Sequence, residues 1–248
     1  MAQPRYRLSR SIIYGYFPTG VKWLLIVNTA IFVLEYISPT VHSLLGPLAL
    51  VPDLVFYRFP WYVWQLFTYM FLHGGIGHLL FNMLALWMFG LPLEQTWGTR
   101  RFLKYYFICG IGAGICDVLV NVALGRHTST IGASGGIYGL LLAFGVLFPD
   151  TTLLMNFLFP IKAKYLVMIY AAIALLSALG SGNSGVSNVA HLGGMLFGLM
   201  YLRVPIPGIR FLRLPEASGW YRQWKMQRAK KKFQVYMRKH DGRGPWVN

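Results

Sequence analysis

The chain has 248 residues, of which 56% are hydrophobic and only 12% are charged. Because a typical globular domain has about 25% charged residues, this composition excludes an ordinary water-soluble domain and indicates one multi-pass membrane domain. The formal net charge of +16 does not indicate nucleic-acid binding, because the basic residues lie at the chain ends and in short loops, not along one face. Such a distribution is typical of the cytoplasmic surface of an integral membrane protein.

Apolar stretches along the chain predict six membrane-spanning helices. They cover residues 21–37, 76–91, 102–124, 132–148, 165–180 and 188–204. Several are shorter than the ~20 residues that cross a bilayer, so flanking apolar residues or a locally thinned membrane must supply the difference. Residues 38–75 contain four prolines and a cluster of aromatic residues suited to the membrane interface, so they predict a long membrane-associated first loop. The predicted fold class is an all-α membrane protein, a bundle of six transmembrane helices.

The distribution of Lys and Arg predicts the orientation of this bundle. The chain divides into a basic N-terminus (1–20), the six-span domain (21–204) and a basic tail (205–248). With both termini on one side, the opposite side carries only Arg58 and Arg126, so 23 minus 2 leaves 21 basic residues on the side of the termini. The positive-inside rule therefore predicts cytoplasmic termini, and we expect a prokaryotic inner membrane. The tail fits equally a helix lying on the anionic inner leaflet and a solvated tail that only fixes topology.

Four polar side chains lie at one depth inside three of the predicted helices. His78 and Asn82 are four residues apart and so share one face of the second helix. Ser134 lies near the start of the fourth helix, and His191 lies near the start of the sixth. These helices all enter from the outer side, so at 1.5 Å per residue the four side chains lie within about 10 Å of the outer surface. Polar groups inside a membrane are costly and mark functional sites.

The chemistry of these residues predicts a nucleophile and its base. A serine becomes nucleophilic when a base takes its proton, and His191 is the best-placed base at the depth of Ser134 apart from His78. The acidic residues lie elsewhere: Glu94 and Asp150 at cytoplasmic helix ends, and Asp117 on the third helix. We therefore predict a Ser–His dyad without a carboxylate, and we expect Asp117 to pair with a backbone group or a polar neighbour.

The surroundings of Ser134 predict an oxyanion-binding site. Ser134 lies in the first turn of its helix, where backbone N–H groups have no helical partner. Together with the Asn82 amide and a His78 N–H, these donors could bind a developing negative charge.

Glycines on the fourth and sixth helices predict that these helices approach closely. Gly194 and Gly198 follow His191 by three and seven residues and so share its face. Small residues let membrane helices approach closely, and Gly132 and Gly135 around Ser134 can meet them.

Taken together, these motifs resemble the signatures of the rhomboid intramembrane serine proteases. They are His78-x-x-x-Asn82, Gly132-x-Ser134-Gly135 and Ala190-His191-x-x-Gly194-x-x-x-Gly198, and the resemblance covers roughly residues 20–204. It implies that Ser134 and His191 form the catalytic dyad and that Asn82 and His78 stabilise the oxyanion. It further implies that Tyr138 stacks on His191 and that Glu94 is a structural acid.

The resemblance also implies the substrate class. The expected substrates are single-span membrane proteins, cut near the outer membrane face in a helix that unwinds easily, with no metal or cofactor. The sequence departs from the family at Trp64-Gln65, where many members have Trp-Arg. This departure concerns the anchoring of the first loop.

Three other interpretations fit parts of the same sequence. Gly132-Ala133-Ser134-Gly135-Gly136 satisfies the G-x-S-x-G pattern of soluble hydrolases, but its apolar flanks contradict the strand and amphipathic helices of that fold. A catalytically weak rhomboid-like protein that binds membrane clients is the alternative function, although the chain retains both serine and histidine. A metal or transport site built from His78, His191 and Asp117 would leave Asn82 and the glycines unexplained.

Overall fold

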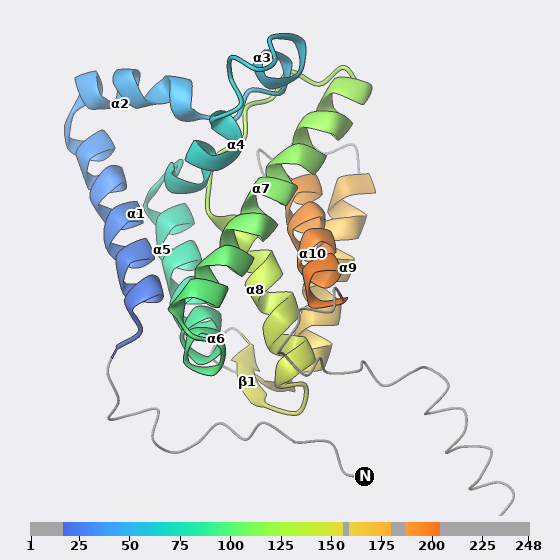
Figure 1. The fold of residues 1–248 in the computed structure, drawn as a ribbon. Coiled ribbons are helices and arrows are strands. Elements are labelled where there is room, and N and C mark those ends of the chain that lie inside the picture. The colour runs from blue at the N-terminus through green and yellow to red at the C-terminus, as the bar shows by residue number, and fades with distance from the viewer. Residues whose placement is uncertain (1–16, 156–158, 180–186, 204–248) are drawn as a thin grey trace, which may run out of the picture. The chain divides into compact units, whose positions relative to one another are not determined.

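The structure is a computed structural model that describes residues 17–155, 159–179 and 187–203. Helices form most of this part of the chain (Figure 1). The longer ones are α1 (Thr19–Ile37), α5 (Ile76–Ala85), α7 (Thr99–Ala123), α8 (Ser134–Leu147), α9 (Ala163–Leu179) and α10 (Asn188–Arg203). The predicted tail 205–248 and most of the predicted N-terminal segment 1–20 lie outside the described residues.

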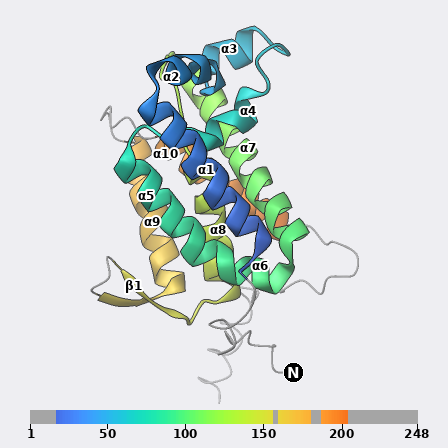
Figure 2. The same ribbon diagram turned by 90° about the vertical axis from the view of Figure 1, so that its left-hand side faces the viewer.

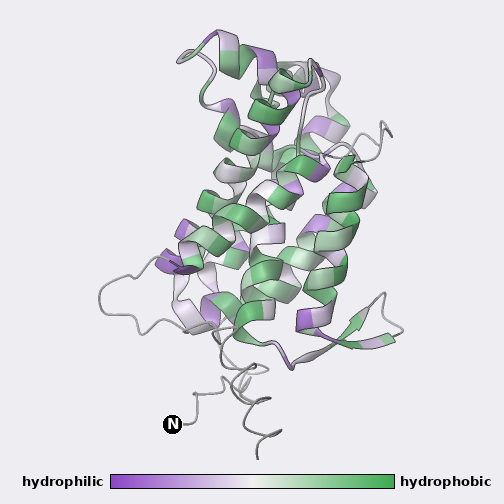
Figure 3. Ribbon diagram, turned by 90° about the vertical axis from the view of Figure 1, so that its right-hand side faces the viewer, coloured by the Kyte–Doolittle hydropathy of each residue, from purple (hydrophilic) through white to green (hydrophobic). Residues whose placement is uncertain are grey.

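The described helices confirm an integral membrane protein that is mostly helical. The π-helical stretch η4 (Leu86–Gly90) joins α5 to α6 (Leu91–Trp97) in one continuous helix. This helix, α1 and α7 are each long and apolar enough to cross a membrane, while α8 and α9 are shorter apolar helices. Hydrophobic residues predominate on the helices in the view of Figure 3. Each of the six predicted stretches coincides with a helix. That the shorter helices also span the membrane is part of the proposal below.

Helix α7 lies at the centre of the bundle, with α8 and α10 packed against it (Figure 1). Two buried tyrosines fasten this centre through their hydroxyl groups. Tyr105 of α7 donates to the Gly139 carbonyl of α8 at 2.8 Å, and Tyr69 donates to the Gly110 carbonyl of α7 at 2.7 Å. Since a buried hydroxyl without a partner is expensive, these bonds also fix how the helices are rotated.

Helix α1 packs at the edge of the bundle against α5 and η4 (Figure 2). Glu94 of α6 stabilises the first turn of α1, because its carboxylate accepts hydrogen bonds from the backbone N–H groups of Gly20 at 2.8 Å and Val21 at 2.7 Å. It also accepts one from the Thr99 hydroxyl at 2.6 Å. An acid at a helix N-terminus satisfies unpaired donors and complements the helix dipole. Glu94 therefore has the structural contacts that the resemblance implies.

The predicted first loop contains short helices, so its description as a loop was incomplete. They are α2 (Pro39–Leu45), η2 (Gly46–Leu48), α3 (Pro52–Tyr57), α4 (Gln65–Thr68) and η3 (Tyr69–Phe71). The prolines do not exclude helices here, because Pro39 and Pro52 occupy the first helical position of α2 and α3. Proline favours that position because its missing N–H would have no helical partner there.

Gln65 anchors this first loop where many rhomboids have arginine. Its side chain is fully buried. The amide oxygen accepts a hydrogen bond from Val51 N at 3.0 Å, and the amide nitrogen donates to the Pro47 carbonyl at 2.9 Å. Although glutamine replaces the arginine of the family pattern, Gln65 still joins α4 to the backbone of the first loop at Pro47 and Val51.

A two-stranded antiparallel hairpin corrects the all-helical prediction. Strands β1 (Thr152–Met155) and β2 (Phe159–Lys162) pair with Thr152 opposite Lys162 and Met155 opposite Phe159. The sequence offered a weak signal: Thr152 is β-branched, and Pro160 removes a donor that a helix would need. In a two-stranded sheet both strands are edges, where proline is tolerated.

Candidate active site

Ser134 is the first residue of α8 and follows a sharp turn at Gly132. Gly132 has φ +120°, a region that disfavours residues with a Cβ. A Cβ at position 132 would also lie 2.7 Å from Nε2 of His78, closer than atoms normally approach. The Gly132 N–H donates to the Tyr69 carbonyl at 2.8 Å, which ties the turn to the first loop. The absence of a side chain at position 132 is therefore what lets α5 approach the start of α8.

His191 lies beside Ser134. It is the fourth residue of α10, it is buried, and its Nε2 lies 2.8 Å from the Ser134 hydroxyl oxygen. Its ring stacks on that of Tyr138, with centroids 4.1 Å apart and planes 6° apart. Among the described residues, Nδ1 of His191 has no hydrogen-bond partner. The stacked ring, not a carboxylate, therefore orients the imidazole toward the serine.

Helices α8 and α10 meet at glycines. A Cβ on Gly194 would lie 2.8 Å from the carbonyl carbon of Gly135 and would overlap its oxygen. A Cβ on Gly198 would overlap the hydroxyl group of Tyr105, so this glycine lets α7, not α8, approach α10. The predicted close approach of α8 and α10 is thus present at Gly135 and Gly194, and it carries Ser134 and His191 to hydrogen-bonding distance. Gly132 and Gly198 do not take part in it, because they face His78 of α5 and Tyr105 of α7.

His78 and Asn82 of α5 reach the same place. Nδ1 of His78 faces the Gly74 N–H at 3.4 Å, a long contact, and Nε2 lies on the side of Gly132. Asn82 is buried, and its Nδ2 would lie 3.6 Å from a Cβ at position 132. Within the described part of the chain this Nδ2 donates to no partner. A buried N–H group without a partner beside a serine can stabilise an anion that forms there.

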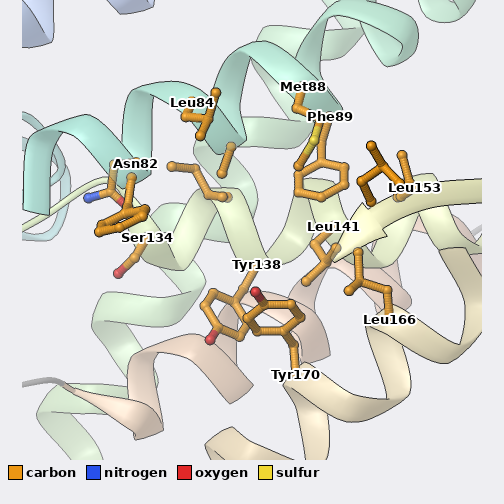
Figure 4. Close-up of a pocket in the computed structure, with 14 residues that line it drawn as sticks. Asn82, Leu84, Met88, Phe89, Ser134, Tyr138, Leu141, Leu153, Leu166 and Tyr170 are labelled. Carbon is orange, nitrogen blue, oxygen red and sulfur yellow. The ribbon is translucent and has the colours of Figure 1, made fainter. Parts of the chain in front are cut away.

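A cavity of about 340 Å³ extends from Ser134 between α5, α8, α9 and β1 (Figure 4). Asn82, Ser134 and Tyr138 line its polar end, and apolar side chains line most of the remainder. Tyr170 of α9 and Leu153 of β1 also line it and were not identified from the sequence. Tyr170 lies inside the predicted span 165–180 and Leu153 lies between two predicted spans. An aromatic or apolar residue at such positions is common in membrane proteins and does not indicate a site.

Asp117 does not contact His191 but pairs with polar neighbours, as expected. Its carboxyl accepts hydrogen bonds from Asn121, Thr130 and Ser187. No group of three His, Cys, Asp or Glu residues in the described ranges is arranged to hold a metal ion. The alternative metal site of His78, His191 and Asp117 therefore lacks an assembled ligand set there.

Comparison with known proteins places this architecture in a family. A family model described as "Rhomboid domain" matches residues 60–207. Over 162 residues the chain is 36% identical to RHOMBOID-like protein 1 of Arabidopsis thaliana, with 65% of this chain and 37% of that protein covered. Over 135 residues it is 35% identical to Rhomboid protease GluP of Bacillus subtilis (strain 168), with 54% and 24% covered.

A third relative comes from an organelle. Over 159 residues the chain is 31% identical to Rhomboid protein 1, mitochondrial, of Saccharomyces cerevisiae, with 61% of this chain and 45% of that protein covered. The chain thus spans less than half the length of these three relatives. Because one of them is mitochondrial, these similarities do not favour the expected prokaryotic inner membrane, which stays a prediction.

Proposed function

Because the chain belongs to the rhomboid family, we propose that it is an intramembrane serine endopeptidase whose nucleophile is Ser134 and whose general base is His191. The observation that carries this proposal is the 2.8 Å separation of Ser134 Oγ and His191 Nε2, beneath a stacked Tyr138 ring. Hydrogen-bond reach between nucleophile and base is the first requirement of this chemistry.

The proposed reaction has two halves. His191 Nε2 takes the proton of the Ser134 hydroxyl while Oγ attacks the scissile carbonyl carbon, and the carbonyl oxygen becomes an oxyanion. The Nδ2 of Asn82, an N–H of His78 and the backbone N–H of Ser134 would donate to this oxyanion. His191 then gives its proton to the leaving amine, which leaves an acyl-enzyme. A water molecule activated by His191 releases the acyl group and restores Ser134.

The substrate is proposed to be a transmembrane segment of a single-span membrane protein, cut near the outer membrane face. The apolar cavity between α5 and α9 is suited to a lipid-soluble chain, and its polar end at Ser134 is suited to an unwound peptide. A helical peptide hides its carbonyl groups in hydrogen bonds, so a segment that unwinds easily is the better substrate.

The proposed topology has six spans and cytoplasmic termini. The spans would be α1, Ile76–Trp97, α7, α8, α9 and α10. Support comes from the 21 of 23 basic residues on the side of the termini. The starts of α7 and α9, where several of these residues lie, are at the end of the bundle that carries β1 (Figure 1). The segments 1–20, 21–204 and 205–248, and the contact of the tail with the inner leaflet, remain predictions.

The test of the proposed function is labelling by a fluorophosphonate probe in detergent micelles, followed by cleavage of a transmembrane substrate. Wild-type protein should be labelled and active, Ser134→Ala should lose both, and His191→Ala should lose cleavage. Ser43→Ala, on the surface of α2, is the matched control and should behave as wild type. A wild-type protein that binds transmembrane clients without being labelled would refute the protease and favour the client-binding alternative.

A further inference from the structure

Asp117 is a carboxyl group inside the bundle that the proposed reaction does not use. It lies in the last third of α7 and is fully buried. The Asn121 amide donates to Oδ1 at 3.0 Å, the Thr130 hydroxyl donates to Oδ2 at 2.9 Å, and the Ser187 hydroxyl donates to Oδ1. Asn121 belongs to the same helix, but the other two donors come from different segments. Asp117 thus joins two distant parts of the chain.

The bond to Ser187 fixes the start of the helix that carries His191. Ser187 directly precedes α10, and its hydroxyl oxygen accepts the backbone N–H of Ala190 at 3.1 Å. This is the position and the hydrogen bond of a helix N-cap. His191 is the next residue after Ala190, and its own N–H points to the Ser187 carbonyl at 3.3 Å. One hydroxyl group therefore both caps α10 and fastens it to Asp117, one turn from His191.

The bond to Thr130 fixes the segment that leads to Ser134. The backbone of Thr130 pairs with Leu50 of the first loop through hydrogen bonds of 2.8 and 3.0 Å. Two residues later Gly132 makes the turn, and Ser134 begins α8. The segments that enter α8 and α10 therefore share one carboxyl group as their anchor.

We propose that Asp117 is a positioning residue that holds Ser134 and His191 in register through Thr130 and Ser187. This inference rests on the proposed function. Asp117 neither contacts the dyad nor lines the cavity, so it sets geometry and does not bind substrate. Loss of this anchor should therefore lower kcat and leave KM unchanged.

The test measures kcat and KM for a transmembrane substrate, with kcat expressed per folded molecule. In Asp117→Asn an amide NH2 group replaces one carboxyl oxygen. If it replaces Oδ1, Ser187 and Asn121 lose their acceptor, and if it replaces Oδ2, Thr130 loses its acceptor. A displacement of about 1 Å in the dyad should lower kcat roughly 10- to 100-fold. Ser187→Ala should show a similar loss, whereas Ser187→Thr, which retains the hydroxyl, should keep wild-type kcat.

Asn121→Ala is the control that tests whether the loss of any hydrogen bond to Asp117 lowers kcat. It removes a hydrogen bond of 3.0 Å to the same oxygen but leaves the links to Thr130 and Ser187, so kcat per folded molecule should stay at the wild-type value. Wild-type kcat in Asp117→Asn, or an equal loss in Asn121→Ala, would overturn the inference while the proposed function stood. Failure of the wild type to label would refute the proposed function and the inference with it. If Asp117→Asn does not fold, Ser187→Ala against Ser187→Thr decides, because Ser187 is only partly buried.

Discussion

A methyl group added at the contact of α8 and α10 should break the hydrogen bond between Ser134 and His191. In Gly194→Ala the new Cβ would lie 2.8 Å from the Gly135 carbonyl carbon. Carbon atoms in contact normally lie about 3.5–4.0 Å apart, so the helices must separate by about 1 Å. The contact partner is backbone, which cannot turn aside as a side chain can. Overpacking of this kind costs roughly 1–3 kcal/mol of stability.

The separation has a direct consequence for the reaction. The Ser134–His191 hydrogen bond, now 2.8 Å long, would stretch toward about 3.8 Å, beyond the range in which a hydrogen bond forms. His191 could then no longer take the Ser134 proton directly, and kcat should fall roughly 100-fold. The assay is cleavage of a transmembrane substrate in detergent, with kcat per folded molecule and the melting temperature recorded together.

Gly77→Ala is the matched control, because no atom lies within 4 Å of a Cβ at position 77. It makes the same exchange in the first turn of α5, where the new methyl group meets no neighbouring segment. It should melt no lower than wild type and cleave at the wild-type rate. If Gly194→Ala cleaves as fast as Gly77→Ala, close helix approach does not position the dyad and the argument fails.

Three further predictions follow from other parts of the structure. Asn82→Ala should lower kcat roughly 10²- to 10³-fold with little change in KM, because its Nδ2 is proposed to bind only the transition state; early melting with normal kcat would contradict this. Gln65→Ala should lower the stability by roughly 1–3 kcal/mol, measured by thermal unfolding, because two backbone groups of the first loop lose their partners; an unchanged melting temperature would show that the loop holds without them. A cysteine replacing Ser43 should react with an impermeant thiol reagent in intact cells and one replacing Ser218 should not; the reverse pattern would overturn the proposed orientation.

The sequence predicted the helices well because each of them needs only a local property. A bilayer span requires a run of apolar residues, and such a run is visible without knowledge of its neighbours. The short helices at Pro39 and Pro52 were missed for an equally local reason. Proline is excluded from helix interiors but favoured at the first helical position, so the four prolines alone do not distinguish a loop from a series of short helices. The hairpin was missed because pairing of Thr152 with Lys162 depends on two segments meeting, which periodicity cannot reveal in four residues each.

The candidate site divides in the same way. Ser134, His191, His78 and Asn82 could be identified from the sequence because polar residues stand out at one depth in apolar helices. The contacts of Asp117 could not, since Thr130 and Ser187 are ordinary loop residues whose importance comes only from where the chain folds them. The sequence placed Asp117 on the third helix but carried no information on the direction it faces.

Two sets of polar groups in this apolar bundle therefore differ in the state of their hydrogen bonds. Gln65, Glu94 and Asp117 bind backbone or side-chain groups from other segments, so their desolvation is offset within the fold. Asn82 Nδ2 and His191 Nδ1, by contrast, have no partner among the described residues and lie around Ser134. A buried donor without a partner destabilises the free protein and gains most when a bound group supplies one. The first set stabilises the arrangement of the helices, and in the second set Asn82 is proposed to bind the oxyanion.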